Sequence, residues 1–293
     1  MTKEDKLITL YLWVCQMYDK CPELKRQRFS NHTQTLFSDQ EVVTIYLWGH
    51  YQKHTTLRHI YDYISDHWRD WFPQMPSYQV FSHRLNNFCE VWEMLLQELW
   101  PPLLEGLPSD RVLDSLPVML AVRGRSYQAK VGLEYADQGY CATKKIYYHG
   151  VKLHVLGARQ AGTLPRPQEL ALTPASRHDL PVLQEVFAVA GPGNLFGDRA
   201  YKDAATEQSL AAQGVTLCTP NKKKPGQKHH GVGESGLWSR FVSSLRQPVE
   251  SFFNWLIAKT DIQDASRVRS ANGLLVHCYG KLTFAFYLLK FNP

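Results

Sequence analysis

NLFGDRAY, residues 194–201, is the stretch of this sequence that decides the fold. Asn194 to Phe196 has the apolar pattern of a short buried strand, Gly197 allows a turn, and Asp198 stands where the strand ends. A helical pattern follows at about residues 203–213. Open α/β sheets bind their ligands outside the carboxyl ends of their strands, so a carboxylate here is a candidate ligand-binding group. The alternative is that Asp198 caps the following helix, a common use of Asp.

A second carboxylate, Asp114, interrupts another apolar strand pattern at residues 111–120. Carboxylates are rarely buried unless they are paired or bind a metal ion, so this position favours a functional role. The alternative is that local backbone amides hold Asp114, helped by the turn-like residues 115–117.

A third carboxylate, Glu250, follows Arg246 by four residues in a segment whose apolar residues have helical spacing, residues 243–259. The two side chains therefore share a helix face, which is also what an ordinary surface ion pair requires. Pro248 indicates that the helix either begins near Gln247 or is kinked.

Six short motifs, in their order along the chain, resemble the DDE transposases of bacterial insertion sequences. They are DSLPV (114–118), GYCATKK (139–145), YYHGVKLH (147–154), LTPASRHD (172–179), GDRAY (197–201) and R-x-x-x-E (246–250). The resemblance extends from about Arg111 to the C-terminus. It implies an α/β fold, an RNase H-like mixed five-stranded sheet flanked by helices, preceded by an all-helical N-terminal domain.

Two domains are predicted, a helical one at residues 1–105 and an RNase H-like DDE catalytic one at residues 106–293. A capping-box pattern at residues 38–41 starts one helix, and another is expected from about residue 77 to residue 100. Its first part, residues 77–87, is the candidate recognition helix of a helix-turn-helix-like DNA-binding domain. The alternative is a plain helical bundle with a solvated charged face.

The catalytic domain has five predicted strands, at residues 111–120, 147–156, 169–173, 194–196 and 215–219. Residues 121–142 show no periodicity and predict an irregular, basic insertion. Asp179 is a possible fourth acidic group, although helix capping accounts for it. The last apolar helix, residues 274–289, is expected to pack on the sheet.

The resemblance implies that Asp114, Asp198 and Glu250 are catalytic and hold two Mg²⁺ ions, for which Mn²⁺ is expected to substitute. Asp114 would bridge both ions, and the other two carboxylates would each hold one. Two such ions can activate a water or 3′-hydroxyl and stabilise the leaving oxygen of a phosphodiester. Oxygen ligands suit Mg²⁺. Ser243 and Ile257 stand where many relatives have Tyr and Lys, so no sub-family is assigned.

Basic side chains are expected to bind DNA, and the chain's net charge of +6 is compatible with a nucleic-acid partner. The candidates are Lys152, His154, Arg199, Lys222, Lys223, Lys224 and Arg246. Exposure on an edge strand is the alternative for the first two. A flexible solvated loop is the alternative for the run from Asn221 to His230.

The predicted function is Mg²⁺-dependent cleavage and strand transfer of insertion-sequence DNA ends. The expected partners are terminal-repeat DNA, target DNA and a second copy of the chain. The scattered cysteines, and the lack of a signal peptide or a bilayer-length apolar run, favour a bacterial cytoplasmic, nucleoid-associated protein. The alternatives are a stand-alone nuclease of the same fold, a catalytically silent DNA-binding protein, and a protein whose acids are only structural.

Overall fold

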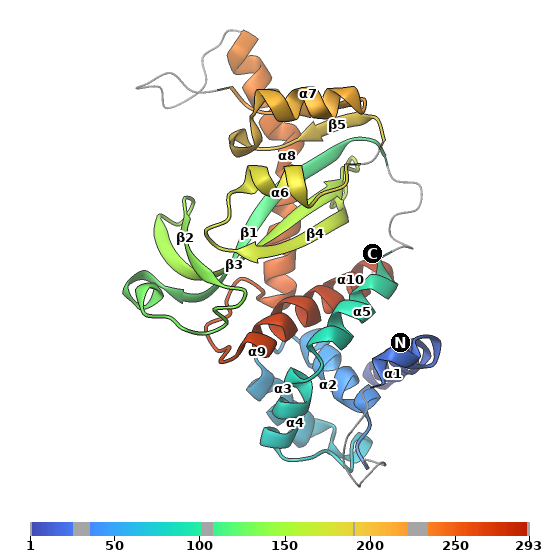
Figure 1. The fold of residues 1–293 in the computed structure, drawn as a ribbon. Helices are drawn as coiled ribbons and strands as arrows, with labels where there is room; N and C mark the ends of the chain where they lie inside the picture. Colours follow the sequence, from blue (N-terminus) through green and yellow to red (C-terminus); the bar gives the residue numbers. More distant parts are fainter. Residues whose placement is uncertain (1, 26–35, 101–107, 190, 222–233, 292–293) are drawn as a thin grey trace. The chain divides into compact units, whose positions relative to one another are not determined.

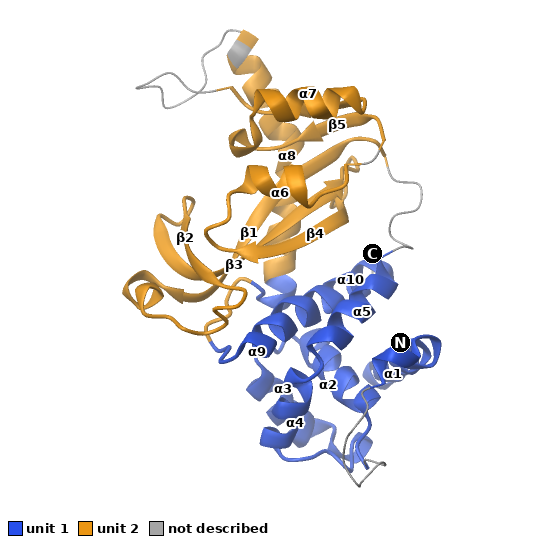
Figure 2. Ribbon diagram, in the orientation of Figure 1, with its two compact units in different colours: residues 1–103, 258–262, 267–293 blue, residues 104–257, 263–266 orange. Residues whose placement is uncertain are grey.

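The computed structural model describes residues 2–25, 36–100, 108–189, 191–221 and 234–291. The chain forms two compact units (Figure 2). Unit 1 comprises residues 1–103, 258–262 and 267–293, and unit 2 comprises residues 104–257 and 263–266. No helix within the described ranges combines the length and apolarity needed to cross a membrane.

Unit 1 is helical throughout its described residues. Its elements are α1 (Lys3–Lys20), η1 (Pro22–Leu24), α2 (Asp39–Tyr51), α3 (Leu57–His67), η2 (Arg69–Trp71), α4 (Tyr78–Asn86), α5 (Cys89–Leu99), α9 (Ala271–Leu275), the π-helical turn η6 (Val276–Gly280) and α10 (Lys281–Phe291). The predicted capping box is confirmed. The Glu41 amide donates to Ser38 Oγ at 3.1 Å, and the Ser38 amide donates to the Glu41 carboxylate at 2.6 Å.

The single helix predicted from residue 77 to residue 100 is wrong, because the structure has two helices there. α4 ends at Asn86, and α5 begins at Cys89. Phe88 lies between them and is buried. The apolar spacing continues through this turn, so periodicity alone did not reveal the break.

The expectation that the last apolar helix packs on the sheet is also wrong. α10 packs against α5 of unit 1, and the Thr283 hydroxyl donates to the Trp92 carbonyl at 3.0 Å. Both Phe284 and Phe286 are buried. A helix that is apolar around its circumference must be buried, but the pattern does not say against which partner.

Unit 2 is built on a mixed sheet (Figure 1). Its strands are β1 (Arg111–Val122), β2 (Asp137–Cys141), β3 (Ile146–Ala158), β4 (Arg166–Pro174), β5 (Gly193–Phe196) and β6 (Val215–Cys218). The strand order is β2-β3-β1-β5-β6, and β4 also pairs with β3. Pairing is antiparallel among β1 to β4 and parallel between β1, β5 and β6.

The five predicted strands are all present, and the α/β fold class is confirmed. The irregular insertion expected at residues 121–142 is wrong in part, because it contains the short helix η4 (Arg123–Tyr127) and the strand β2. β2 pairs with residues 146–150 of β3, and β4 pairs with the rest of that strand. β3 is therefore long enough to support a hairpin beyond the central sheet.

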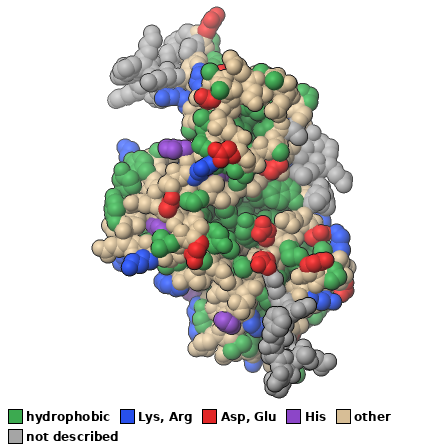
Figure 3. All heavy atoms as spheres, in the orientation of Figure 1, with side chains coloured by type: hydrophobic (Ala, Val, Ile, Leu, Met, Phe, Trp, Pro, Cys, Tyr) green, Lys and Arg blue, Asp and Glu red, His purple; other side chains and the backbone are tan. Residues whose placement is uncertain are grey.

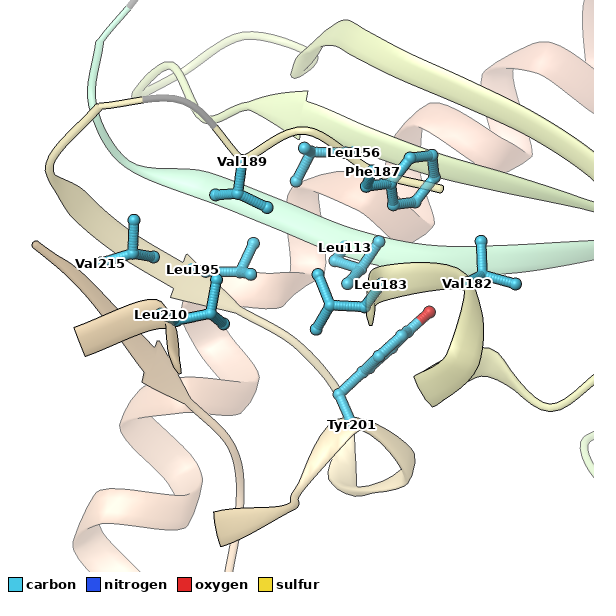
Figure 4. Close-up of a cluster of buried hydrophobic side chains, with 10 residues drawn as sticks. All are labelled: Leu113, Leu156, Val182, Leu183, Phe187, Val189, Leu195, Tyr201, Leu210 and Val215. Atoms are coloured by element: carbon cyan, nitrogen blue, oxygen red, sulfur yellow. The ribbon is translucent and has the colours of Figure 1, made fainter. Parts of the chain in front are cut away.

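Helices cover both faces of this sheet (Figure 1). α6 (Asp179–Glu185) and α7 (Ala204–Ala212) lie on one face, and α8 (Glu234–Thr260) crosses the other. Figure 4 shows the core between the sheet and the first two helices. It consists of Leu113, Leu156, Val182, Leu183, Phe187, Val189, Leu195, Tyr201, Leu210 and Val215. Because Leu113 faces α6 and α7, its neighbour Asp114 points to the α8 face.

α8 decides between the two expectations for Pro248. The helix begins at Glu234, so the alternative of a start near residue 247 is wrong, and Pro248 lies inside the helix. Buried residues on both sides of the proline, Val242 and Phe252 among them, hold the helix against unit 2. Packing of this kind offsets the roughly 3 kcal/mol that an interior proline costs a helix.

Candidate active site

Asp114 and Asp198 are brought together by strand register. The parallel pairing of β1 with β5 matches Val112 with Phe196, and each aspartate follows two residues later. Neighbouring strands lie about 4.8 Å apart, so equivalent positions are close in space. The electrostatic effect of Asp198 on Asp114 agrees, because it raises the pKa of the Asp114 carboxyl.

Asp114 is held by two donors. The Ser115 amide donates to its Oδ1 at 2.8 Å, and Arg246 Nη2 donates to its Oδ2 at 2.8 Å. The side chains of Asp114 and Arg246 are only 20% and 14% exposed. Burial raises the pKa of Asp114 to about 6, although Arg246 acts in the opposite direction. A carboxylate in such a place needs a positive charge beside it.

Asp198 is placed by a tight turn after β5. A Cβ at Gly197 would lie 2.9 Å from the Tyr201 ring, so glycine allows the chain to pass close to that side chain. Asp198 Oδ1 then accepts a hydrogen bond from the Ala200 amide at 2.7 Å, which caps the short helix η5 (Arg199–Tyr201). Asp198 therefore caps η5 beside Asp114, whereas the N-cap of the helix expected at residues 203–213, α7, is Asp203.

Glu250 is exposed on α8, one helical turn or roughly 6 Å along the axis from Arg246. Across the described part of the chain, no three His, Cys, Asp or Glu side chains are grouped closely enough to hold a metal ion. The structure thus assembles the Asp114–Asp198 pair and brings the Glu250 helix to it through Arg246.

The donor chemistry fits a hard divalent cation. Asp114 and Asp198 supply only carboxylate oxygens, and one of the two is largely buried. The group that contacts Asp114 directly is a cation, the Arg246 guanidinium. The pair of aspartates therefore offers oxygen ligands of the kind that Mg²⁺ prefers, one of them a largely buried carboxylate that positive charge stabilises.

A cluster of polar side chains on the opposite face of the sheet was missed at the sequence level. Asp179 Oδ1 accepts from Ser115 Oγ at 3.2 Å and from Lys152 Nζ at 3.2 Å, and it lies 3.7 Å from His154 Nδ1. The capping role expected for Asp179 is wrong, because the N-cap of α6 is His178. Ser115 belongs to both settings, since its amide binds Asp114 and its hydroxyl binds Asp179.

Tyr201 is close enough to Asp114, Asp198 and Asp179 for their charges to act on it. Its side chain is 1% exposed, and its hydroxyl has no hydrogen-bond partner among the described residues. Burial raises the pKa of the phenol, and the charges of Asp179, Asp114 and Asp198 raise it further. Figure 4 shows the ring reaching from η5 towards α6. The tyrosine of the GDRAY motif therefore lies close to the candidate site.

Apart from Arg246, which pairs with Asp114, the predicted DNA-binding residues fall into three groups. Arg199 is exposed beside Asp198. Lys152 and His154 instead have protein partners, because Lys152 binds Asp179 and the Arg177 carbonyl, and the fully buried His154 binds Thr173 at 2.9 Å. Burial leaves His154 without access to DNA in this arrangement. Lys222, Lys223 and Lys224 lie outside the described residues.

The candidate recognition helix in unit 1 is α4. Its Arg84 is committed to internal contacts, donating to Asp39 at 2.6 Å and to the Phe37 carbonyl at 2.8 Å. His83 is exposed and lies 3.3 Å from Asn87. Of the basic side chains in α4, the one free to face a partner is therefore His83 rather than Arg84.

Comparison with known proteins identifies the family. A family model described as the transposase DDE domain matches residues 109–287. No curated protein and no solved structure matches the chain. The match covers both aspartates, the Arg246–Glu250 turn and the whole sheet, and it agrees with the RNase H-like strand order. The chain therefore belongs to the transposase DDE domain family.

Proposed function

We propose that this transposase-family protein cuts the DNA ends of its own mobile element and joins them to target DNA, with Mg²⁺ as cofactor. The observation that carries the proposal is the in-register pair of Asp114 and Asp198, with Arg246 of α8 bound to the first. These groups lie at the carboxyl ends of β5 and within β1, where α/β sheets bind ligands.

Asp114, Asp198 and Glu250 are the residues proposed to hold the metal, with Mn²⁺ able to replace it. When bound, Mg²⁺ would supply the positive charge that activates a water or 3′-hydroxyl and stabilises the leaving oxygen. The chain's own groups do the positioning. Ser115 and Arg246 hold the Asp114 carboxylate in place, and the Ala200 amide orients Asp198.

DNA contacts are proposed for Arg199 and Arg246. Arg199 is exposed beside Asp198, and the Arg246 guanidinium has five donors of which one reaches Asp114. A guanidinium that faces a carboxylate site can also bind a phosphate oxygen there. The same role is proposed for the lysines of the 222–224 run, on the strength of their charge alone.

The test uses a plasmid carrying the element's gene with about 200 base pairs of flanking DNA, incubated with the purified full-length chain. Cleaved ends and joined products are expected with Mg²⁺ and not with EDTA. Asp114→Asn, Asp198→Asn and Glu250→Gln should each reduce both products at least about 100-fold, since direct ligands matter more than their supporting residues. Glu207→Gln, an acidic residue on α7, is the matched control and should retain activity.

The outcomes separate the alternatives. Cleavage without joined ends would indicate a stand-alone nuclease. Full function in Asp198→Asn would indicate a DNA-binding protein whose carboxylates are not catalytic. We further propose that two copies bring two DNA ends together in the cytoplasm. Sedimentation of the DNA complex at the mass of one chain with two ends would contradict the dimer.

A further inference from the structure

Three exposed tyrosines form a cluster on the β2–β3 hairpin, away from the carboxylates. Tyr140 and Tyr147 are cross-strand partners, and their rings lie 5.0 Å apart. Tyr127 of η4 joins them, with its ring 6.1 Å from Tyr147. Tyr127 is 64% exposed, Tyr140 is 51% exposed and Tyr147 is 50% exposed. Large aromatic side chains grouped on a surface indicate a binding site more often than a single exposed one does.

The hairpin holds this cluster outward for a structural reason. Side chains alternate between faces along a strand, so Tyr148, next to Tyr147, points the other way and is fully buried. Opposite it, Gly139 has no side chain because a Cβ would lie 2.4 Å from the Ala175 carbonyl oxygen. The inner face of the hairpin is therefore packed against the rest of unit 2, and the three tyrosines of the outer face stay exposed.

Positive charge surrounds the three tyrosines. Residues 123–147 contain five basic side chains and two acidic ones. The basic set is Arg123, Arg125, Lys130, Lys144 and Lys145, all exposed. Within the part of the chain that the structure describes, Arg125, Lys130 and Lys145 form no ion pair. Figure 3 shows hydrophobic side chains gathered over the β2 hairpin with Lys and Arg side chains beside them.

The backbone at two of these basic residues adopts a costly conformation. Arg123 has φ of 55° and Lys145 has φ of 53°, in the left-handed region that favours glycine. A non-glycine residue is strained in that region. The turn that ends β2 and the turn that begins η4 therefore carry basic side chains where glycine would be more stable.

We propose that this surface, the tyrosine platform (Tyr127, Tyr140 and Tyr147 with the five basic residues around them), binds unpaired DNA strands. Every base has an aromatic face that can stack on a tyrosine ring, and the basic side chains bind the phosphates. The proposal deepens the proposed function, since such strands are produced when a DNA end is opened or cut. Neither the carboxylate site nor the residues proposed above to bind DNA include this surface.

The position of the platform sets a distance along the DNA. β1 continues for eight residues beyond Asp114 and ends at Val122, next to η4. Eight residues of strand span roughly 27 Å. Successive phosphates are spaced 3.4 Å along the axis of a DNA helix, and an unpaired strand can extend further per nucleotide. A strand held at the carboxylates would therefore reach the platform at most roughly eight nucleotides from the reacting phosphate.

The test measures binding of the full-length chain to a fluorescent 20-nucleotide mixed-sequence DNA strand and to the corresponding blunt duplex, in EDTA. Stacking predicts tighter binding to the single strand. Tyr140→Leu/Tyr147→Leu should weaken single-strand binding at least about 25-fold, from 1–3 kcal/mol per stacked base. Tyr140→Phe/Tyr147→Phe keeps the rings and should bind as the wild type does.

The charge contribution is tested separately. Lys130→Gln/Lys145→Gln should lower the slope of log K against log salt by about 1.4, or 0.7 for each lost phosphate contact on a single strand. The matched control is Lys3→Gln/Lys25→Gln, which removes the same charge from exposed positions in unit 1. An equal change in both double variants would show a net-charge effect and would overturn the assignment of the surface.

Two further outcomes would overturn the proposal. The first is unchanged single-strand binding in the leucine variant. The second is a change in the mass of the leucine variant, measured by light scattering without DNA, because such a change would make the tyrosines an interface between copies. Plasmid cleavage by the same variants is scored independently. If the wild-type chain showed no Mg²⁺-dependent cleavage, the proposed function would be contradicted, whereas the result on single-strand binding would remain valid.

Discussion

Replacing Arg246 with Gln should destabilise unit 2 measurably, because the Asp114 carboxylate would lose its one direct cation. Removing a partner from a buried ion pair costs 3–5 kcal/mol. These side chains retain 20% and 14% exposure, so screening by water reduces the expected loss to about 2–4 kcal/mol. For a unit of this size, that loss corresponds to a fall in Tm of roughly 4–16 °C.

The assay is thermal unfolding in EDTA, followed by circular dichroism or calorimetry, arranged as a double-mutant cycle. Asp114→Asn removes the buried charge, so the Arg246→Gln change should cost much less in that background. A coupling energy of about 1–2 kcal/mol is expected between the two positions. Lys259→Gln, which removes an exposed cation from the same helix, is the control and should change stability by less than about 0.5 kcal/mol.

The reasoning would be refuted by a coupling energy within error of zero. It would also fail if Arg246→Gln were as mild as Lys259→Gln, since the carboxylate would then be stable without its arginine. Either result would remove the main structural link between α8 and β1.

Three other changes have defined expectations. Asp179→Asn should cost about 1–3 kcal/mol and be coupled to Lys152→Met in a double-mutant cycle, because a charge-assisted bond is lost. Gly150→Ala should cost about 3 kcal/mol or more, since its Cβ would lie 2.0 Å from a backbone carbonyl oxygen, whereas Gly124→Ala has open space and should be close to neutral. Burial lowers the pKa of His50 well below 6.5, so at low pH the unfolded chain binds a proton that the folded chain excludes. The free energy of unfolding should therefore fall as pH drops below about 6.5, by up to 1.4 kcal/mol per pH unit. Urea titrations at several pH values should show a flatter slope in His50→Asn.

The strands that carry the aspartates were predictable because their signal is local. An apolar run interrupted or ended by a carboxylate is visible without tertiary information, as residues 111–120 and 194–198 show. The distance between Asp114 and Asp198 follows from pairing register, which the sequence does not contain. Their proximity was expected only from the family resemblance.

The errors come from interactions that are distant in sequence. Asp179 reads as a helix cap until Ser115 and Lys152 approach it from two strands, 64 and 27 residues away. Pro248 left two alternatives open, a helix start or a proline inside the helix, and burial of the residues around it stabilises the second. β2 was missed because the sequence DQGYC has weak strand propensity, and its pairing with β3 supplies the stability.

The division of the chain into units has a consequence for its synthesis. Unit 1 needs residues from both ends of the chain, while unit 2 is complete by residue 266. At 5–20 residues per second, the ribosome takes roughly 8–33 s to go from the end of the first segment of unit 1 to the start of its last one. During that interval the α5 surface that later receives Thr283 and the rest of α10 has no intramolecular cover. Unit 2 is therefore able to fold first, and the helices of residues 1–103 depend on the later residues 267–293 to complete their core.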